Sequence, residues 1–203
     1  MRNVIVTNMA SADGFYEGAN RDLGALFRHM HPDYAGDEVF DQYNLERLLY
    51  ADTLLLSGRT NLMGFRDYWH GRGDNPQATQ VRRSIARRMD EIQKAVVSDQ
   101  IMPHECAPWG ETEIVRIADA NAWLAEKKAG PGRDILIMAG RTMWNSFLKA
   151  GLVDEIHLAL FPLIGGSGTK LFDESPDAAL RLIEARSRQG SGVVILRYAV
   201  DYA

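Results

Sequence analysis

Short apolar runs recur along the chain up to residue 150, separated by longer segments with a helical pattern. The runs are rich in Val, Ile and Leu, which is typical of strands buried on both faces of a sheet. We predict strands at residues 4–9, 53–57, 94–98, 113–117 and 134–138. The segments between them carry apolar residues three or four positions apart, the spacing of one buried helix face. We predict helices at residues 37–50, 60–67, 77–93, 121–129 and 142–150.

Strands that alternate with helices indicate an α/β fold of three layers, with a mainly parallel sheet and helices on both of its faces. After Gly151 the pattern changes, because three strand-like runs follow one another without helices between them, at residues 155–161, 181–186 and 193–200. This arrangement predicts an antiparallel C-terminal edge on the parallel sheet. No repeat or linker is visible, so we expect a single domain over residues 1–203.

The predicted helix 77–93 carries four arginines, Arg82, Arg83, Arg87 and Arg88, mostly off its apolar stripe. The simplest interpretation is a solvated helix face, which we favour over a phosphate site.

Composition narrows the class of partner. With 46% hydrophobic residues, a net charge of −4 and scattered Lys and Arg, the chain lacks the basic patch expected of a protein that binds nucleic acid or an anionic membrane. We therefore expect a small-molecule partner. Cys106 is the single cysteine, and the chain starts with a short apolar run without the features of an export signal. These features predict a cytoplasmic protein in which Cys106 has no chemical role.

The predicted strand 53–57 runs into Gly58, Arg59 and Thr60 at the start of a helix. This arrangement points free backbone N–H groups at an anion. Gly58 would let a phosphate approach the backbone, Thr60 could cap the helix, and Arg59 could bind a second phosphate. A capped turn without a ligand is the alternative interpretation.

The predicted strand 134–138 ends in the same way, at Ala139, Gly140, Arg141 and Thr142. Ligands of open α/β sheets bind beyond the carboxyl ends of strands, so both turns and Ser98, which ends the strand 94–98, could share one crevice. The two turns together could hold a dinucleotide. Alternatively, the small residues only allow the helix to pack closely on its strand. No G-x-G-x-x-G fingerprint follows any predicted strand.

Two other motifs carry less weight. The run Gly165-Gly166-Ser167-Gly168-Thr169-Lys170 lacks the spacing of a phosphate loop and leads toward a strand, so we interpret it as a turn. His29 and His31 have no third ligand at a suitable spacing, so we expect no metal.

Taken in order, several short motifs carry a resemblance to a known family. They are Ser11-Ala12-Asp13-Gly14, Gly58-Arg59-Thr60, Lys94-Ala95-Val96-Val97-Ser98, Ala139-Gly140 and Gly151-Leu152-Val153-Asp154-Glu155. The chain resembles the dihydrofolate reductase superfamily from about residue 4 to residue 198. More narrowly, it is similar to the RibD C-terminal reductase domain of riboflavin-biosynthesis deaminase-reductases and to its stand-alone relatives. The resemblance implies a dihydrofolate reductase-like domain.

The resemblance implies NADPH as cofactor. It places the cofactor phosphates at Gly58, Arg59 and Thr60, and the adenosine ribose phosphate at Ser98 with Arg59 as its cation. Ala139 and Gly140 correspond to the consecutive glycines of classical reductases, which are joined by a cis peptide bond. Alanine departs from that pattern, so either the cis bond is retained or this cofactor contact differs.

On the substrate side, the resemblance places a mobile loop from Asp13 to about Gly36, and Asp13 is a candidate proton donor. Asp41 is a candidate substrate contact, although a solvent-facing helix acid is the alternative. Because no acid stands at the spacing of the classical folate enzyme, we expect a different pyrimidine- or pteridine-like substrate. A dihydrofolate reductase, a non-catalytic nucleotide-binding relative and a purely structural protein remain alternatives. The family also implies a homodimer.

Overall fold

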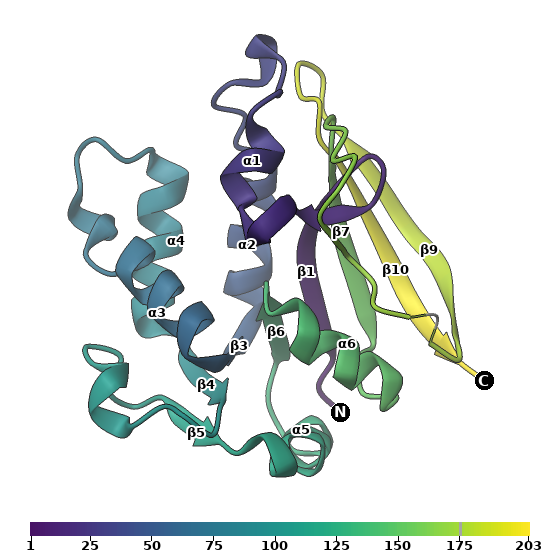
Figure 1. The fold of residues 1–203 in the computed structure, drawn as a ribbon. Helices are drawn as coiled ribbons and strands as arrows, with labels where there is room; N and C mark the ends of the chain where they lie inside the picture. The colour runs from purple at the N-terminus through teal and green to yellow at the C-terminus, as the bar shows by residue number, and fades with distance from the viewer. Residues whose placement is uncertain (175) are drawn as a thin grey trace.

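The computed structural model describes residues 1–174 and 176–203. Within them, eight strands form one twisted sheet in the order β5-β4-β3-β6-β1-β7-β10-β9 (Figure 1). The strands with parallel neighbours are β1 (Val4–Ser11), β3 (Ala51–Ser57), β4 (Gln93–Val97), β5 (Glu113–Val115), β6 (Asp134–Met138) and β7 (Glu155–Phe161). The antiparallel edge consists of β10 (Val194–Tyr202) and β9 (Ala178–Ser187). Two short strands, β2 (Phe15–Glu17) and β8 (Thr169–Lys170), pair separately.

Helices cover both faces of the parallel strands, which confirms the predicted three-layer architecture. One face carries α2 (Val39–Tyr50), α3 (Gly58–Trp69) and α4 (Gln80–Glu91), and the other carries α5 (Ala120–Ala129) and α6 (Arg141–Lys149). Side chains alternate along each strand. Leu54 and Leu56 therefore pack with the first group of helices, whereas Leu55 packs with the second. A short helix, α1 (Leu23–Phe27), lies in the long connection between β2 and α2.

Two of the four arginines of α4, Arg88 and Arg83, differ from the predicted solvated face. Arg88 donates hydrogen bonds from Nε to the carbonyl of Leu48 at 3.0 Å and from Nη2 to that of Ala51 at 2.8 Å. These carbonyls lie at the C-terminal end of α2, where no intrahelical N–H is available for them. Arg83 similarly donates to the carbonyl of Ala78. The prediction was wrong for these two residues, because a helical pattern contains no information about which carbonyls an arginine will reach. It fits Arg87, whose side chain is 63% exposed.

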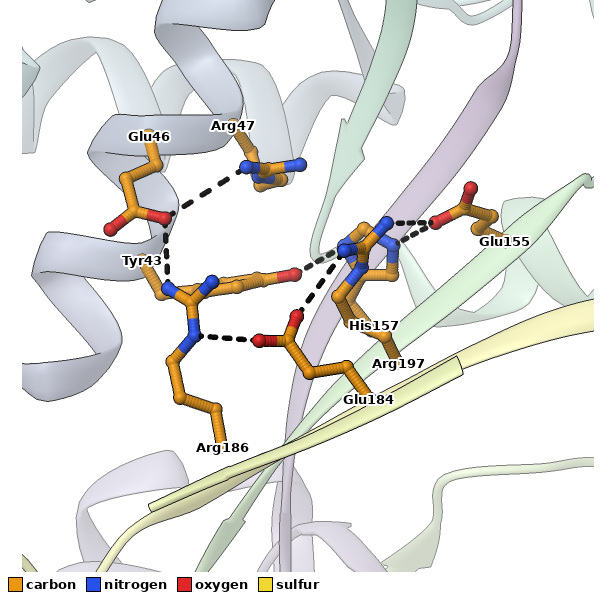
Figure 2. Close-up of polar contacts among 8 residues, drawn as sticks. All are labelled: Tyr43, Glu46, Arg47, Glu155, His157, Glu184, Arg186 and Arg197. Atoms are coloured by element: carbon orange, nitrogen blue, oxygen red, sulfur yellow. Dashed lines mark hydrogen bonds and ion pairs between the residues drawn. The ribbon is translucent and has the colours of Figure 1, made fainter. Parts of the chain in front are cut away.

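A buried histidine joins α2 to β7. The His157 side chain has its Nδ1 2.8 Å from Tyr43 Oη and its Nε2 2.7 Å from Glu155 Oε2 (Figure 2). Burial lowers the pKa of His157, so the ring is neutral near pH 7. Its Nε2–H then donates a hydrogen bond to the Glu155 carboxylate, while Nδ1 accepts a hydrogen bond from the Tyr43 hydroxyl. The hydrogen bond from His157 lowers the pKa of Glu155 to about 2.

These hydrogen bonds are part of a larger polar network, which continues across the antiparallel strands and returns to α2 (Figure 2). Arg197 on β10 donates to Glu155 at 3.0 Å and to Glu184 of β9 at 3.2 Å. Arg186, also on β9, donates to Glu184 at 3.3 Å and to Glu46 of α2 at 2.9 Å. Each acid in this network therefore lies beside an arginine, and the network connects α2 to β7, β9 and β10.

Among the described residues, no helix has both the length and the apolar character needed to cross a bilayer. The parallel strands determine where the candidate site lies. Their carboxyl ends meet at one edge of the sheet, so the turns that follow β1, β3, β4, β6 and β7 gather there.

Candidate functional site

The turn between β3 and α3 leaves a helix N-terminus open. Gly58 begins α3 with a left-handed φ of +58°, and no side chain caps the helix. A Cβ placed on Gly58 would have nothing within 4 Å. The predicted cap by Thr60 was wrong, because the helix starts earlier than expected and Thr60 lies inside its first turn. Asn61 instead accepts a hydrogen bond from the backbone N–H of Ser57 at 2.9 Å.

The turn between β6 and α6 lies directly against the first. Ala139 and Gly140 both have left-handed φ values, +62° and +66°, and no side chain caps α6. A Cβ on Gly140 would lie 2.6 Å from Ser57 Oγ and 3.0 Å from Ser57 Cβ. The Ala139–Gly140 bond is trans, so the cis bond that the resemblance implies is not retained here. Two uncapped helix N-termini therefore lie side by side on neighbouring strands β3 and β6.

Ser98 lies at the same edge, because β4 pairs with β3 as far as Val97 opposite Ser57. Its side chain is buried, and Ser98 Oγ accepts a hydrogen bond from the N–H of Gln100 at 3.1 Å. The next residue, Asp99, accepts a hydrogen bond from the N–H of Ile117 at 3.0 Å. A hydroxyl and a carboxylate thus follow β4 beside the first turn.

Arg59 is held by an acid that sequence reasoning missed. Its Nε and Nη2 donate to Glu105 Oε1 at 2.9 and 2.7 Å, and Glu105 Oε2 accepts the N–H of Met102 at 3.0 Å. The Met102 N–H, and next the Arg59 guanidinium, hold the pKa of Glu105 below its usual range. No local motif could have identified this pair, since the two residues are 46 positions apart.

Arg141 turns its guanidinium toward the segment after β8. It donates from Nε to the carbonyl of Lys170 and forms an ion pair with Asp173. Its backbone N–H and that of Thr142 belong to the first turn of α6, where no intrahelical acceptor is available. At this position the backbone, rather than the arginine side chain, is available to an anion.

Asp13 joins the loop after β1 to the loop after β7. Its carboxylate accepts hydrogen bonds from Ser11 Oγ at 2.6 Å and from the N–H groups of Gly165 and Gly166, each at 2.8 Å. Those bonds, the Ser11 bond foremost, hold the pKa of Asp13 well below its usual range. A carboxylate held in its ionised form cannot supply a proton near pH 7, so the structure argues against Asp13 as proton donor.

Asp41 pairs with a neighbouring helix. Its Oδ2 accepts a hydrogen bond from Arg82 Nε of α4 at 2.9 Å. The structure therefore gives Asp41 a contact between helices, which differs from both interpretations of the sequence. Its predicted role toward substrate gains no support from this contact.

An apolar cluster lies beside Asp13. Phe15 and Leu163 are buried and pack with the partly buried Phe27 and Phe161, whose ring centroids are 5.3 Å apart. Lys170 Nζ lies 3.9 Å from the centre of the Phe15 ring. Phe15 and Phe27 come from the segment predicted as a mobile loop, and here both contribute to packing against β7.

Comparison with known proteins gives a consistent result. The model of the RibD C-terminal domain family matches residues 2–196. A Bacillus subtilis (strain 168) protein described as uncharacterized protein YyaP is 36% identical over 208 residues, covering 97% of this chain and 94% of that protein.

Solved structures share the fold at lower identity. A putative riboflavin biosynthesis protein from Shewanella sp. PV-4 has a TM-score of 0.62 at 21% identity, with 99% of both chains covered. The deaminase/5-amino-6-(5-phosphoribosylamino)uracil reductase of Thermotoga maritima gives 0.61 at 12% identity, with 98% of this chain and 56% of that one covered. An Enterococcus faecalis dihydrofolate reductase complexed with NADP(H) gives 0.56 at 9% identity, with 98% and 96% covered.

Proposed function

The chain belongs to the RibD C-terminal domain family, and from that premise we propose that it is an NADPH-dependent reductase of a small pyrimidine- or pteridine-like heterocycle. The substrate class follows the reductase of riboflavin biosynthesis that acts on 5-amino-6-(5-phosphoribosylamino)uracil, whose name the Thermotoga relative carries. Because its one cysteine, Cys106, is buried and unpaired, we place the enzyme in the reducing cytoplasm.

One observation carries the proposal, namely the contact between the turns that begin α3 and α6. Gly140 is packed on Ser57, so the open N-termini of two helices face the same edge of the sheet. Helix N-termini present free N–H groups and a partial positive charge, which suit the phosphates of a dinucleotide. The residues that would hold the cofactor are Gly58, Arg59, Thr60, Ser98, Ala139, Gly140, Arg141 and Thr142.

When bound, NADPH would supply a hydride to an electrophilic C=N or C=O carbon of the substrate. The protein's own contribution is to bind and align the two reactants, which accounts for much of the acceleration in such reactions. The loops joined by Asp13 and the aromatic side chains beside it would form a rigid apolar wall for a planar heterocycle. Because Asp13 is held ionised, we assign the proton to water.

Replacement of Arg59 by alanine tests the cofactor assignment. We expect NADPH to bind about 10- to 100-fold more weakly, because a charge-assisted hydrogen bond to the 2′-phosphate contributes about 1.5–3 kcal/mol. NADH binding should change less than about threefold on the same grounds. Calorimetric titration of both nucleotides measures the two affinities directly.

Arg87→Ala is the matched control for that variant. It removes another exposed arginine in an ion pair, with Asp74, away from the candidate site and from the antiparallel edge, and should leave both affinities unchanged. Equal weakening of NADPH and NADH by Arg59→Ala would reject the assignment of Arg59. Tight NADPH binding without turnover of any heterocycle would favour the non-catalytic alternative, and turnover of dihydrofolate would favour a folate reductase.

We also propose a homodimer formed through the antiparallel edge. Leu180 and Leu182 of β9 are 42% and 54% exposed and lie opposite Val200 and Tyr198 of β10. This pair of strands extends beyond the helices that cover the parallel strands (Figure 1). An exposed apolar face on an edge strand is a typical site for a second copy of the chain.

Leu182→Arg should convert the dimer to a monomer, because it places a charge in the centre of that face. Sedimentation equilibrium at micromolar concentration measures the mass. The control is Leu49→Arg, which changes a leucine of similar exposure, 55%, at the end of α2. A wild-type protein that sediments as a monomer would reject the proposed assembly.

A further inference from the structure

We infer that Glu105 is a specificity-determining residue, which reduces the preference of the protein for NADPH over NADH. The inference rests on the proposed function, because it concerns the binding of a nicotinamide dinucleotide at the turn after β3. The Glu105 carboxylate competes with the 2′-phosphate of NADPH for the guanidinium of Arg59.

The geometry shows why the competition falls on Arg59. Glu105 Oε1 takes both hydrogen bonds from the guanidinium, and Oε2 is held by the Met102 N–H. The Glu105 side chain is only 16% exposed, whereas Arg59 is 54% exposed. The carboxylate is therefore the fixed partner and the arginine the movable one. A phosphate can recruit Arg59 only by sharing it with Glu105 or by drawing it away.

The surrounding charges act in the same direction. Asp99 follows Ser98 at the end of β4 and accepts a hydrogen bond from the N–H of Ile117, so a second carboxylate lies at this strand end. The negative charge of a 2′-phosphate would be repelled by a carboxylate at this strand end. A free ribose 2′-hydroxyl, by contrast, can donate a hydrogen bond to a carboxylate. Asp99 thus disfavours NADPH and tolerates NADH, in opposition to Arg59, whereas Glu105 acts through its hold on Arg59.

A purely structural role for Glu105 makes different predictions. Arg66 of α3 donates to the Glu105 carbonyl at 2.7 Å, so the segment that contains Glu105 is fastened to α3 by its backbone as well. Loss of a structural contact would lower the melting temperature and change the binding of both nucleotides alike. Loss of a competitor for Arg59 would change the binding of NADPH alone.

The test is a calorimetric titration of wild type and Glu105→Gln with NADPH and with NADH. Glutamine keeps the size of the side chain and an oxygen for the Met102 N–H, but removes the charge. We expect NADPH to bind about two- to fivefold more tightly, the range for release of an exposed ion pair, while NADH affinity stays unchanged. In an Arg59→Ala background, Glu105→Gln should leave the ratio of the two affinities unchanged.

Two further variants separate competition for Arg59 from the general effect of losing one negative charge. Glu111→Gln removes one negative charge at another exposed position and should leave the ratio at its wild-type value. Glu105→Asp keeps the charge but places it farther from Arg59. We expect its ratio of NADPH to NADH affinity to lie between those of wild type and Glu105→Gln. This variant provides the test if the glutamine variant folds poorly. An unchanged ratio in Glu105→Gln and Glu105→Asp overturns the inference alone. Absence of binding of either nucleotide to wild type overturns the proposed function together with it.

Discussion

We expect a Gly140→Val variant to lose about 3 kcal/mol of unfolding free energy and all measurable dinucleotide binding. Gly140 has a φ of +66°, which is unfavourable for a branched side chain, and any Cβ there would lie 2.6 Å from Ser57 Oγ. Valine would therefore separate the turns after β3 and β6, whose contact forms the candidate phosphate site. Urea denaturation measures the stability, and titration with NADPH measures the binding.

Gly151→Val provides the matched control for Gly140→Val. Gly151 has a similar φ of +73°, but a Cβ there would have nothing within 4 Å. This variant should show the cost of the left-handed backbone alone, about 1–2 kcal/mol, and should retain NADPH binding. If Gly140→Val still bound NADPH as wild type does, the two turns could not be the cofactor site.

Replacement of His157 by alanine should cost about 3 kcal/mol of unfolding free energy, because two hydrogen bonds are lost and a cavity is left in the core. The ring is 1% exposed and is bonded to Tyr43 and Glu155 at once. His70→Ala is the control, since His70 bonds to Asp90 at 3.1 Å with a side chain that is 48% exposed. A cost below 1 kcal/mol at His157 would show that this link between α2 and β7 is dispensable.

The dependence of stability on pH gives the His157 variant a second readout. Because burial lowers the pKa of His157, the unfolded chain takes up a proton on this ring at a higher pH than the folded protein does. The wild type should therefore be most stable above the ordinary histidine pKa of about 6.5 and lose up to about 1.4 kcal/mol per pH unit below it. The alanine variant should lack this decline down to about pH 5, below which the carboxylates of the unfolded chain begin to take up protons.

The sequence by itself determined the architecture. Buried parallel strands are continuous apolar runs and amphipathic helices repeat every three to four residues, so local patterns were sufficient to predict the three layers and the antiparallel edge. The two turns that begin α3 and α6 were also visible, because each consists of a strand end and a glycine within a few residues. The family resemblance placed both turns in one site.

Only the tertiary structure decided what the polar side chains do. Glu105 meets Arg59 across 46 positions, Asp13 binds the amide of Gly165 across 152, and Tyr43 meets His157 across 114. A charged side chain has no periodic pattern that identifies its partner, and several acids were equally available to each arginine in the sequence. Which of them it meets depends on how strands and helices distant in the chain are packed together, and that packing made Asp13 a contact between the loops after β1 and β7.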